Sequence, residues 1–170
     1  MDWAQRRLLH ACRDGDLARA QHAVYQHGAS VYDVCTDDRQ GLTALHVVCR
    51  YNHLSIVQWI VTQCDYYVHS RDAIFQSTPL MLAAEAGHAR VVDFLLRHAK
   101  PNINQVDAHG WTALHLACMH QHEQVVALLL QHHHHHHHHP RHRSAHVVTT
   151  TTTTTTRTKT KINVNRACIP

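Results

Sequence analysis

The chain has 170 residues and a formal net charge of +4, with 22 histidines and six cysteines. The positive charge is concentrated at one end: residues 1–139 carry ten basic and twelve acidic side chains, and residues 140–170 add six basic ones and no acid. The first 139 residues are therefore not basic, so we expect no specific nucleic-acid binding. No stretch approaches the ~18 apolar residues of a membrane span, and the N-terminus lacks the apolar core of a secretory signal.

One pattern recurs three times along the chain, and a weaker copy lies upstream in LLHACRDGDLARAQHAV. The three clear copies are GLTALHVVCRYNHLSIVQWIV from Gly41, STPLMLAAEAGHARVVDFLL from Ser77 and GWTALHLACMHQHEQVVALLL from Gly110. Aligned on Val48, Ala83 and Ala117, they are 35 and 34 residues apart. Self-similarity at this period is typical of stacked repeats rather than of one globular core.

Each copy predicts two helices. The first helix follows Thr43, Thr78 or Thr112, because a threonine side chain accepts a backbone N–H bond at a helix start, and Pro79 suits the first helical position. The second helix carries its apolar residues in pairs one turn apart, which makes one apolar stripe. The stripes are Ile56, Val57, Ile60 and Val61; Val91, Val92, Leu95 and Leu96; Val125, Val126, Leu129 and Leu130. A single helix pair cannot bury such a stripe alone, so the pairs must stack.

The motifs Thr43-Ala-Leu-His46, Thr78-Pro-Leu and Thr112-Ala-Leu-His115 resemble the T-P-L-H signature of the ankyrin repeat family. The resemblance implies an all-α fold, an ankyrin-repeat α-solenoid of stacked helix pairs with projecting loops. It covers residues 4–131. The predicted repeats are 4–36, 37–71, 72–106 and 107–131, followed by a disordered tail at 132–170.

The cysteines indicate a reducing, intracellular location, cytoplasmic or nuclear. Cys12, Cys49 and Cys118 follow the repeat register, where a small residue is needed between helices, and are predicted to be buried thiols. The other three are scattered and form no C-x-x-C pair or short disulfide framework.

The histidines fall into three groups. His46 and His115 close the motif, and the resemblance implies that each bonds back to its capping threonine. His53, His88 and His122 share one register at the turn between the paired helices and are predicted to form a ladder along the stack. We expect no metal site in either group, because stacked repeats lie ~10 Å apart and no cluster has zinc spacing.

The third group is the run His132–His139, followed by a Thr149–Thr156 run. A repeated CAC codon encodes histidine and, shifted by one nucleotide, becomes ACC for threonine, which suggests a frame change. One alternative is therefore the ankyrin region of a longer protein, truncated or frame-shifted at the histidine tract. Another is a metal- or pH-responsive protein acting through the histidine run.

No catalytic constellation is found: the sequence has no Gly-rich phosphate loop, G-x-S-x-G or H-E-x-x-H motif. We expect no enzyme, cofactor, metal or small-molecule substrate, and a protein-binding adaptor as the leading function. Ankyrin proteins bind through loop tips and the exposed positions of the first helices, and self-association through the last repeat is a further expectation. The partner-binding candidates are Arg13, Arg39, Gln40, Leu42, Arg50, Tyr51, Ile74, Phe75, Ser77, Glu85, His109, Trp111, Met119 and His120.

Overall fold

The computed structural model describes residues 3–33, 41–63 and 66–137. All regular elements within these ranges are helical, which confirms the predicted all-α solenoid. They are α1 (Trp3–Asp14), α2 (Leu17–His27), α3 (Ala44–Arg50), α4 (Leu54–Gln63), the 3-10 turn η1 (Tyr66–His69), α5 (Pro79–Glu85), α6 (Ala89–His98), α7 (Ala113–Met119) and α8 (Glu123–His137).

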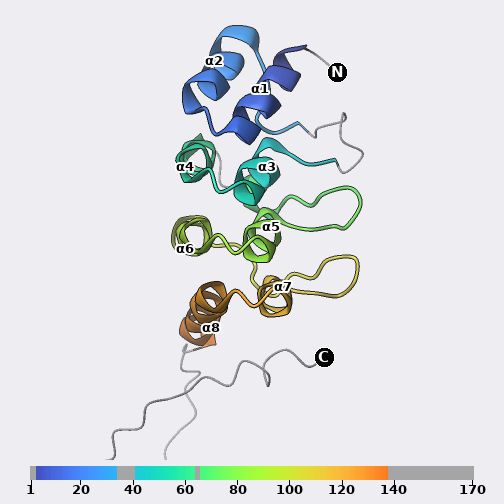
Figure 1. Ribbon diagram of the computed structural model, residues 1–170, viewed down its shortest axis with the longest axis vertical. Helices are drawn as coiled ribbons and strands as arrows, with labels where there is room; N and C mark the ends of the chain where they lie inside the picture. Colours follow the sequence, from blue (N-terminus) through green and yellow to red (C-terminus); the bar gives the residue numbers. More distant parts are fainter. Residues whose placement is uncertain (1–2, 34–40, 64–65, 138–170) are drawn as a thin grey trace, which may run out of the picture.

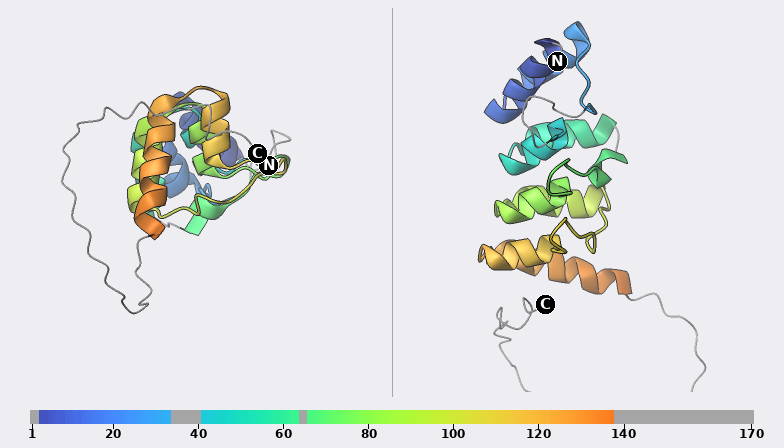
Figure 2. Two further views of the ribbon diagram at one scale, coloured as in Figure 1. Left: turned by 90° about the horizontal axis from the view of Figure 1, so that it is seen from below. Right: turned by 90° about the vertical axis from the view of Figure 1, so that its right-hand side faces the viewer.

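The helices form two parallel columns. The inner column is α1, α3, α5 and α7, and the outer column is α2, α4, α6 and α8, with the long loops projecting from the inner side (Figure 1). Each inner helix contacts the next inner helix as well as its own outer partner. Figure 2 shows the same stack from the side, with one helix pair above another. The molecule is therefore built from local contacts between neighbouring pairs, as in other repeat solenoids.

The inner helices begin where the threonines predict. Thr43, Thr78 and Thr112 are the residues before α3, α5 and α7, and each forms a capping box with the third helical residue. The Thr78 hydroxyl accepts the Met81 N–H at 3.3 Å, and Pro79 occupies the first helical position. These caps satisfy N–H groups that the helix itself leaves without partners.

The core is a continuous seam between the two columns. The stripe residues of α4 and α6 are all buried, and in α8 Val125, Val126 and Leu129 are buried while Leu130 is half-buried. Small residues lie on the inner helices at the predicted register, and Ala83 and Ala84 on α5 are completely buried. Close approach of the helices therefore depends on these small side chains.

The cysteines at this register are buried, as predicted. Cys12 and Cys49 carry thiols, and burial raises the pKa of the Cys49 thiol well above its usual range. Cys118 lies at the equivalent position but is disulfide-bonded, so the predicted thiol is wrong there.

The last outer helix runs past the predicted domain end at residue 131 and continues to His137. The preceding outer helix, α6, ends at His98 because Lys100 adopts a positive φ of 45° and Pro101 follows. No glycine or proline follows α8 before Pro140, so no residue stops the helix within the histidine run. The part of the predicted tail beyond residue 137 lies outside the described residues.

Candidate partner-binding surface

Two buried aspartates hold the loop tips. Asp72 Oδ1 accepts the backbone N–H groups of Ile74 at 3.0 Å and Phe75 at 2.6 Å. One repeat later, Asp107 Oδ1 accepts those of His109 at 2.8 Å and Trp111 at 2.9 Å. Because a carboxylate with two such donors fixes the turn, the side chains at the tips are presented in one defined arrangement.

The tips carry exposed apolar side chains that lie next to one another. Ile74, Phe75 and Trp111 are 47, 44 and 40 % exposed. The His109 ring lies between the two aromatic rings, with centroids 6.0 Å from Phe75 and 6.0 Å from Trp111. The Ala108 N–H donates to the Phe75 carbonyl at 2.7 Å, which joins the two loops. The tips therefore form one apolar surface across two repeats.

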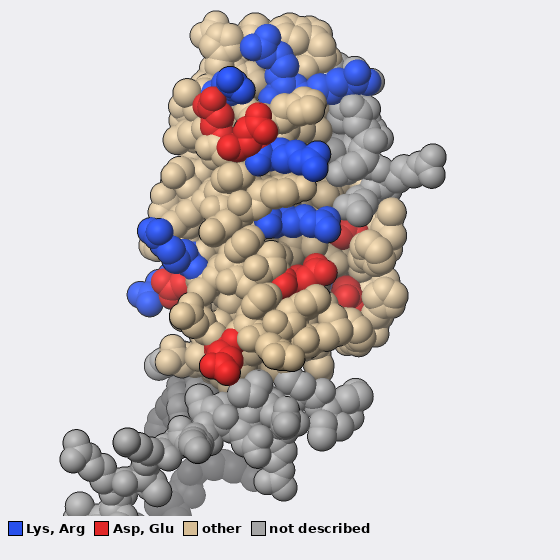
Figure 3. Space-filling model, viewed as in Figure 1, with Lys and Arg blue, Asp and Glu red and all other residues tan. Residues whose placement is uncertain are grey.

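The C-terminal ends of the inner helices carry a second set of predicted contact residues. Arg13, Arg50, Glu85 and Met119 occupy equivalent places near the ends of α1, α3, α5 and α7. The Arg13 guanidinium lies over the Tyr51 ring, 5.5 Å from its centroid. Figure 3 shows basic and acidic side chains side by side in the upper part of this face, and further acidic ones lower down. The charged side chains at these equivalent places are therefore Arg13 on α1, Arg50 on α3 and Glu85 on α5.

Most of the predicted contact residues lie on this surface. The exposed ones are Arg13, Arg50, Tyr51, Ile74, Phe75, His109, Trp111, Met119 and His120, and Glu85 is half-buried. Leu42 and Ser77 differ from the prediction that they are surface contact residues, because their side chains are only 5 and 6 % exposed. Leu42 packs in the hydrophobic core, and the Ser77 carbonyl accepts the Asp72 N–H at 3.0 Å beneath the loop. Arg39 and Gln40 lie outside the described residues.

The motif histidines have the structural role that the resemblance implied. The Thr43 N–H donates to His46 Nδ1 at 3.1 Å, so the ring proton lies on Nε2, which donates to the Ser77 carbonyl at 3.1 Å. Burial lowers the pKa of His46, partly opposed by the bond to Ser77 and by the charge of Asp72. At the equivalent position, His115 Nδ1 accepts the Thr112 N–H at 3.2 Å.

The turn histidines form the predicted ladder, with hydrogen bonds to the preceding repeat. Their Nε2 atoms each lie 2.9 Å from a backbone carbonyl near the end of the inner helix above. The pairs are His53 with Arg13, His88 with Arg50, and His122 with Glu85. Each bond satisfies a carbonyl that its own helix leaves without a partner, and so ties neighbouring repeats together.

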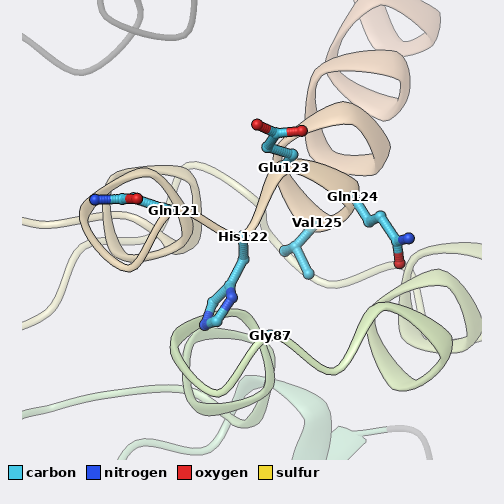
Figure 4. Close-up of a pocket in the computed structure, with 6 residues that line it drawn as sticks. All are labelled: Gly87, Gln121, His122, Glu123, Gln124 and Val125. Atoms are coloured by element: carbon cyan, nitrogen blue, oxygen red, sulfur yellow. The ribbon is translucent and has the colours of Figure 1, made fainter.

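A shallow pocket of about 280 Å³ lies at the last of these junctions. It is lined by Gly87, Gln121, His122, Glu123, Gln124 and Val125. Figure 4 shows the His122 ring pointing toward the turn at Gly87 and the Glu123 carboxylate pointing away from it. An acid–base pair needs the two groups within hydrogen-bonding reach, so this arrangement favours a structural junction.

Gly87→Ala is expected to lower the free energy of unfolding by about 1–2 kcal/mol. Gly87 has a φ of +76°, and an added Cβ would lie 2.6 Å from the His122 ring. Gly87→Asn is the matched control, since Asn52 holds the equivalent turn at a φ of 65° above His88. Urea denaturation followed by circular dichroism checks both. Equal losses for alanine and asparagine would contradict the assigned backbone cause.

The outer column carries an aromatic stripe that the sequence interpretation missed. Tyr25, Trp59 and Phe94 occupy one register on α2, α4 and α6. Trp59 Nε1 donates to the Tyr25 hydroxyl at 3.3 Å, and Tyr25 is 63 % exposed. These three residues are 34 and 35 residues apart, which matches the repeat period and would have predicted their shared register from the sequence. The stripe lies on the outer column, away from the loop tips.

The described residues contain no group of three or more His, Cys, Asp or Glu placed to hold a metal ion. In the same part of the chain, no helix has the length and apolar character needed to cross a bilayer.

A stack of helix pairs joined by projecting loops defines a repeat solenoid. Two family models match: ankyrin repeats (3 copies) over residues 55–140, and ankyrin repeats (many copies) over residues 8–61. The chain belongs to the ankyrin repeat family, whose repeats are protein–protein interaction modules.

Several curated proteins are similar to this chain. The palmitoyltransferase AKR1 of Lachancea kluyveri is 31 % identical over 71 % of the chain and 16 % of its own length. The putative palmitoyltransferase ZDHHC13 of Danio rerio is 29 % identical over 72 % of the chain and 18 % of its own length. The human transient receptor potential cation channel subfamily A member 1 is 34 % identical over 58 % of the chain and 9 % of its own length. The chain thus spans less than a fifth of each.

Proposed function

We propose that the chain is an adaptor that binds a segment of a partner protein between the loop tips and the ends of the inner helices. The observation that carries this proposal is the joined apolar surface of Phe75, His109 and Trp111, whose rings are held side by side by ordered loops. Aromatic and arginine side chains dominate the energy of protein interfaces, and exposed apolar patches of this kind mark binding sites.

The charges on this surface favour one partner chemistry. Arg13 and Tyr51 form a cation–π pair at the α1–α3 end, and the Arg13 guanidinium would stabilise an acidic side chain of the partner. Phe75 and Trp111 offer an apolar surface, and Met119, 50 % exposed, extends it along the inner column. The fitting ligand is an extended segment with an apolar anchor and an acidic residue.

Replacing both Trp111 and Tyr51 by alanine is expected to weaken such binding more than tenfold, or about 1.4 kcal/mol. Both side chains are exposed, so the melting temperature should change little. The probe is a peptide selected on the full chain from a displayed random library, and fluorescence polarisation measures its affinity for each variant.

Tyr25→Ala is the matched control, because it removes an exposed aromatic side chain from the outer column. It should leave the peptide affinity unchanged. Selected peptides that bind the double variant as tightly as the parent chain, or that lose affinity with Tyr25→Ala, would place binding elsewhere.

A second proposal is that this adaptor is the ankyrin region of a longer protein. It is supported by the relatives, in which the matching segment covers 16 to 18 % of the two palmitoyltransferases. Sequencing the transcript across the histidine tract tests it. A reading frame that regains the repeat pattern after the tract supports the proposal, and a single frame confirmed in several transcripts argues against it.

A further inference from the structure

One cysteine differs from its equivalents in the other repeats. Cys12, Cys49 and Cys118 hold the same register on α1, α3 and α7, but Cys118 is disulfide-bonded and the other two carry thiols. Cys12 and Cys49 are completely buried, because a further inner helix packs against each of theirs, whereas Cys118 is 8 % exposed on the last inner helix of the described residues. A second sulfur therefore reaches this register at the end of the stack and not inside it.

The sulfur bonded to Cys118 belongs to a cysteine outside the described residues. The chain has six cysteines, and the two other described ones carry thiols. The partner is therefore Cys35, Cys64 or Cys168. A disulfide needs Cα atoms no more than about 7 Å apart, so the positions of neighbouring described residues decide among these three.

Cys64 is too far from Cys118. It directly follows Gln63, the last residue of α4, so its Cα lies within about 4 Å of that residue. α4 belongs to the second helix pair and α7 to the fourth, with α5 and α6 between them (Figure 1). Two helix layers separate α4 from α7 by about 20 Å, which is well beyond the reach of a disulfide.

Cys35 is also too far. Gln5 on α1 bonds both the carbonyl and the N–H of Ser30, at 2.8 and 3.0 Å, which fixes Ser30 in the first layer. Cys35 follows Ser30 by about five residues, which span at most about 18 Å when fully extended. Three layers, about 30 Å, separate α1 from α7, so a gap of about 12 Å remains.

Cys168 can reach Cys118. α8 begins at Glu123, shortly after Cys118, and its 15 residues span about 22 Å. From the end of α8 at His137, residues 138–168 lead to Cys168. A random coil of about 31 residues has a root-mean-square end-to-end distance of about 30 Å, which is enough to retrace the length of α8. Of the three candidates, Cys168 alone satisfies the distance limit.

The end of the stack offers apolar side chains to a segment held there. Leu114 on α7 and Leu130 on α8 are half-buried, whereas their equivalents Leu80 and Leu96 are 1 and 3 % exposed. Near Cys168 the sequence supplies apolar residues of its own, namely Ile162, Val164 and Ile169. Contact between the two sets would remove apolar area from water.

We propose that Cys118 and Cys168 form a disulfide that ties the C-terminal segment across the end of the repeat stack. The bond acts as a redox switch: oxidation holds the segment on α7 and α8, and reduction releases it. This switch does not depend on the proposed partner-binding surface, which lies on the loop side.

Formation of the bond consumes a small-molecule disulfide, such as oxidised glutathione. The thiolate of one cysteine attacks the small disulfide, which releases one small thiol and leaves a mixed disulfide. The thiolate of the other cysteine then attacks the mixed disulfide and releases the second small thiol. The two protons and two electrons of the protein thiols therefore leave on two small thiols.

The first test maps the bond in the full chain after equilibration with oxidised glutathione. Free thiols are alkylated, and a tryptic digest is analysed by mass spectrometry without reduction. Trypsin releases Cys118 within residues 98–141 and Cys168 within residues 167–170, so these two peptides should appear joined and should separate with dithiothreitol. The proposal is overturned if Cys118 remains a thiol, carries glutathione alone or is joined to Cys35 or Cys64. A disulfide-linked dimer on a non-reducing gel overturns it as well.

The second test compares the melting temperatures of the oxidised and reduced chain. The oxidised chain should melt about 5–15 °C higher, because the bond restricts the unfolded chain. Hydrogen exchange in α7 and α8 should be slower in the oxidised chain, since the segment covers them.

Cys168→Ser should abolish both differences, and Cys64→Ser is the matched control that should keep them. Cys118→Ala should also abolish them and still fold, because Ala84 holds the equivalent position on α5. The switch is disproved if reduction changes neither quantity, or if it changes both equally in the Cys168→Ser chain.

Discussion

Ala84→Asp is expected to lower the free energy of unfolding by about 3–5 kcal/mol, the cost of an unpaired buried charge. Ala84 is completely buried on α5, where the inner helices of neighbouring repeats meet. A carboxylate there is removed from water without a partner. Because stability in a repeat stack is shared between neighbours, the change should affect the repeats on both sides.

Urea denaturation of the full chain measures this effect. Ala18→Asp is the control, because Ala18 is exposed at the start of α2 and the same substitution should change stability by no more than about 0.5 kcal/mol. Equal urea midpoints for the two variants would contradict the complete burial of Ala84.

His46→Met is expected to cost about 0.5–1.5 kcal/mol at pH 7, because the buried hydrogen bond from His46 Nε2 to the Ser77 carbonyl is lost, while the Asp72 N–H still donates to that carbonyl. Met81 shows that methionine keeps the helix cap at this position. His115→Met, at the half-exposed equivalent, should cost less, since its Nε2 meets no acceptor in the described chain. Parallel urea titrations compare the two variants.

The cost of His46→Met should shrink as the pH falls below 6.5. Burial lowers the pKa of folded His46 below its ordinary value of 6.5, so the unfolded chain takes up a proton first. Stability from His46 is complete above pH 6.5 and decreases below it, by at most about 1.4 kcal/mol per pH unit. A difference between parent and variant that stays constant from pH 7.5 to pH 5 would contradict a neutral, buried His46.

The sequence by itself determined the helix pairs and their register. Thr43, Thr78 and Thr112 cap the inner helices through bonds to the residue three positions on, and the outer-helix stripes follow a local period. Both are short-range effects, which is why residue patterns predict them. The loop tips and inner-helix ends were likewise predicted from the family resemblance, and most of their residues are exposed.

Only the tertiary structure decided which of these residues face solvent and which bonds join the repeats. Leu42 and Ser77 look like loop residues in the sequence, but Leu42 is buried in the hydrophobic core, and Ser77 is buried with its carbonyl accepting from His46 Nε2 and the Asp72 N–H. The acceptors of the turn histidines lie 37 to 40 residues away, at carbonyls that any residue type provides. Because every residue provides a backbone carbonyl, the sequence does not identify these acceptors, and only the stacked structure shows them.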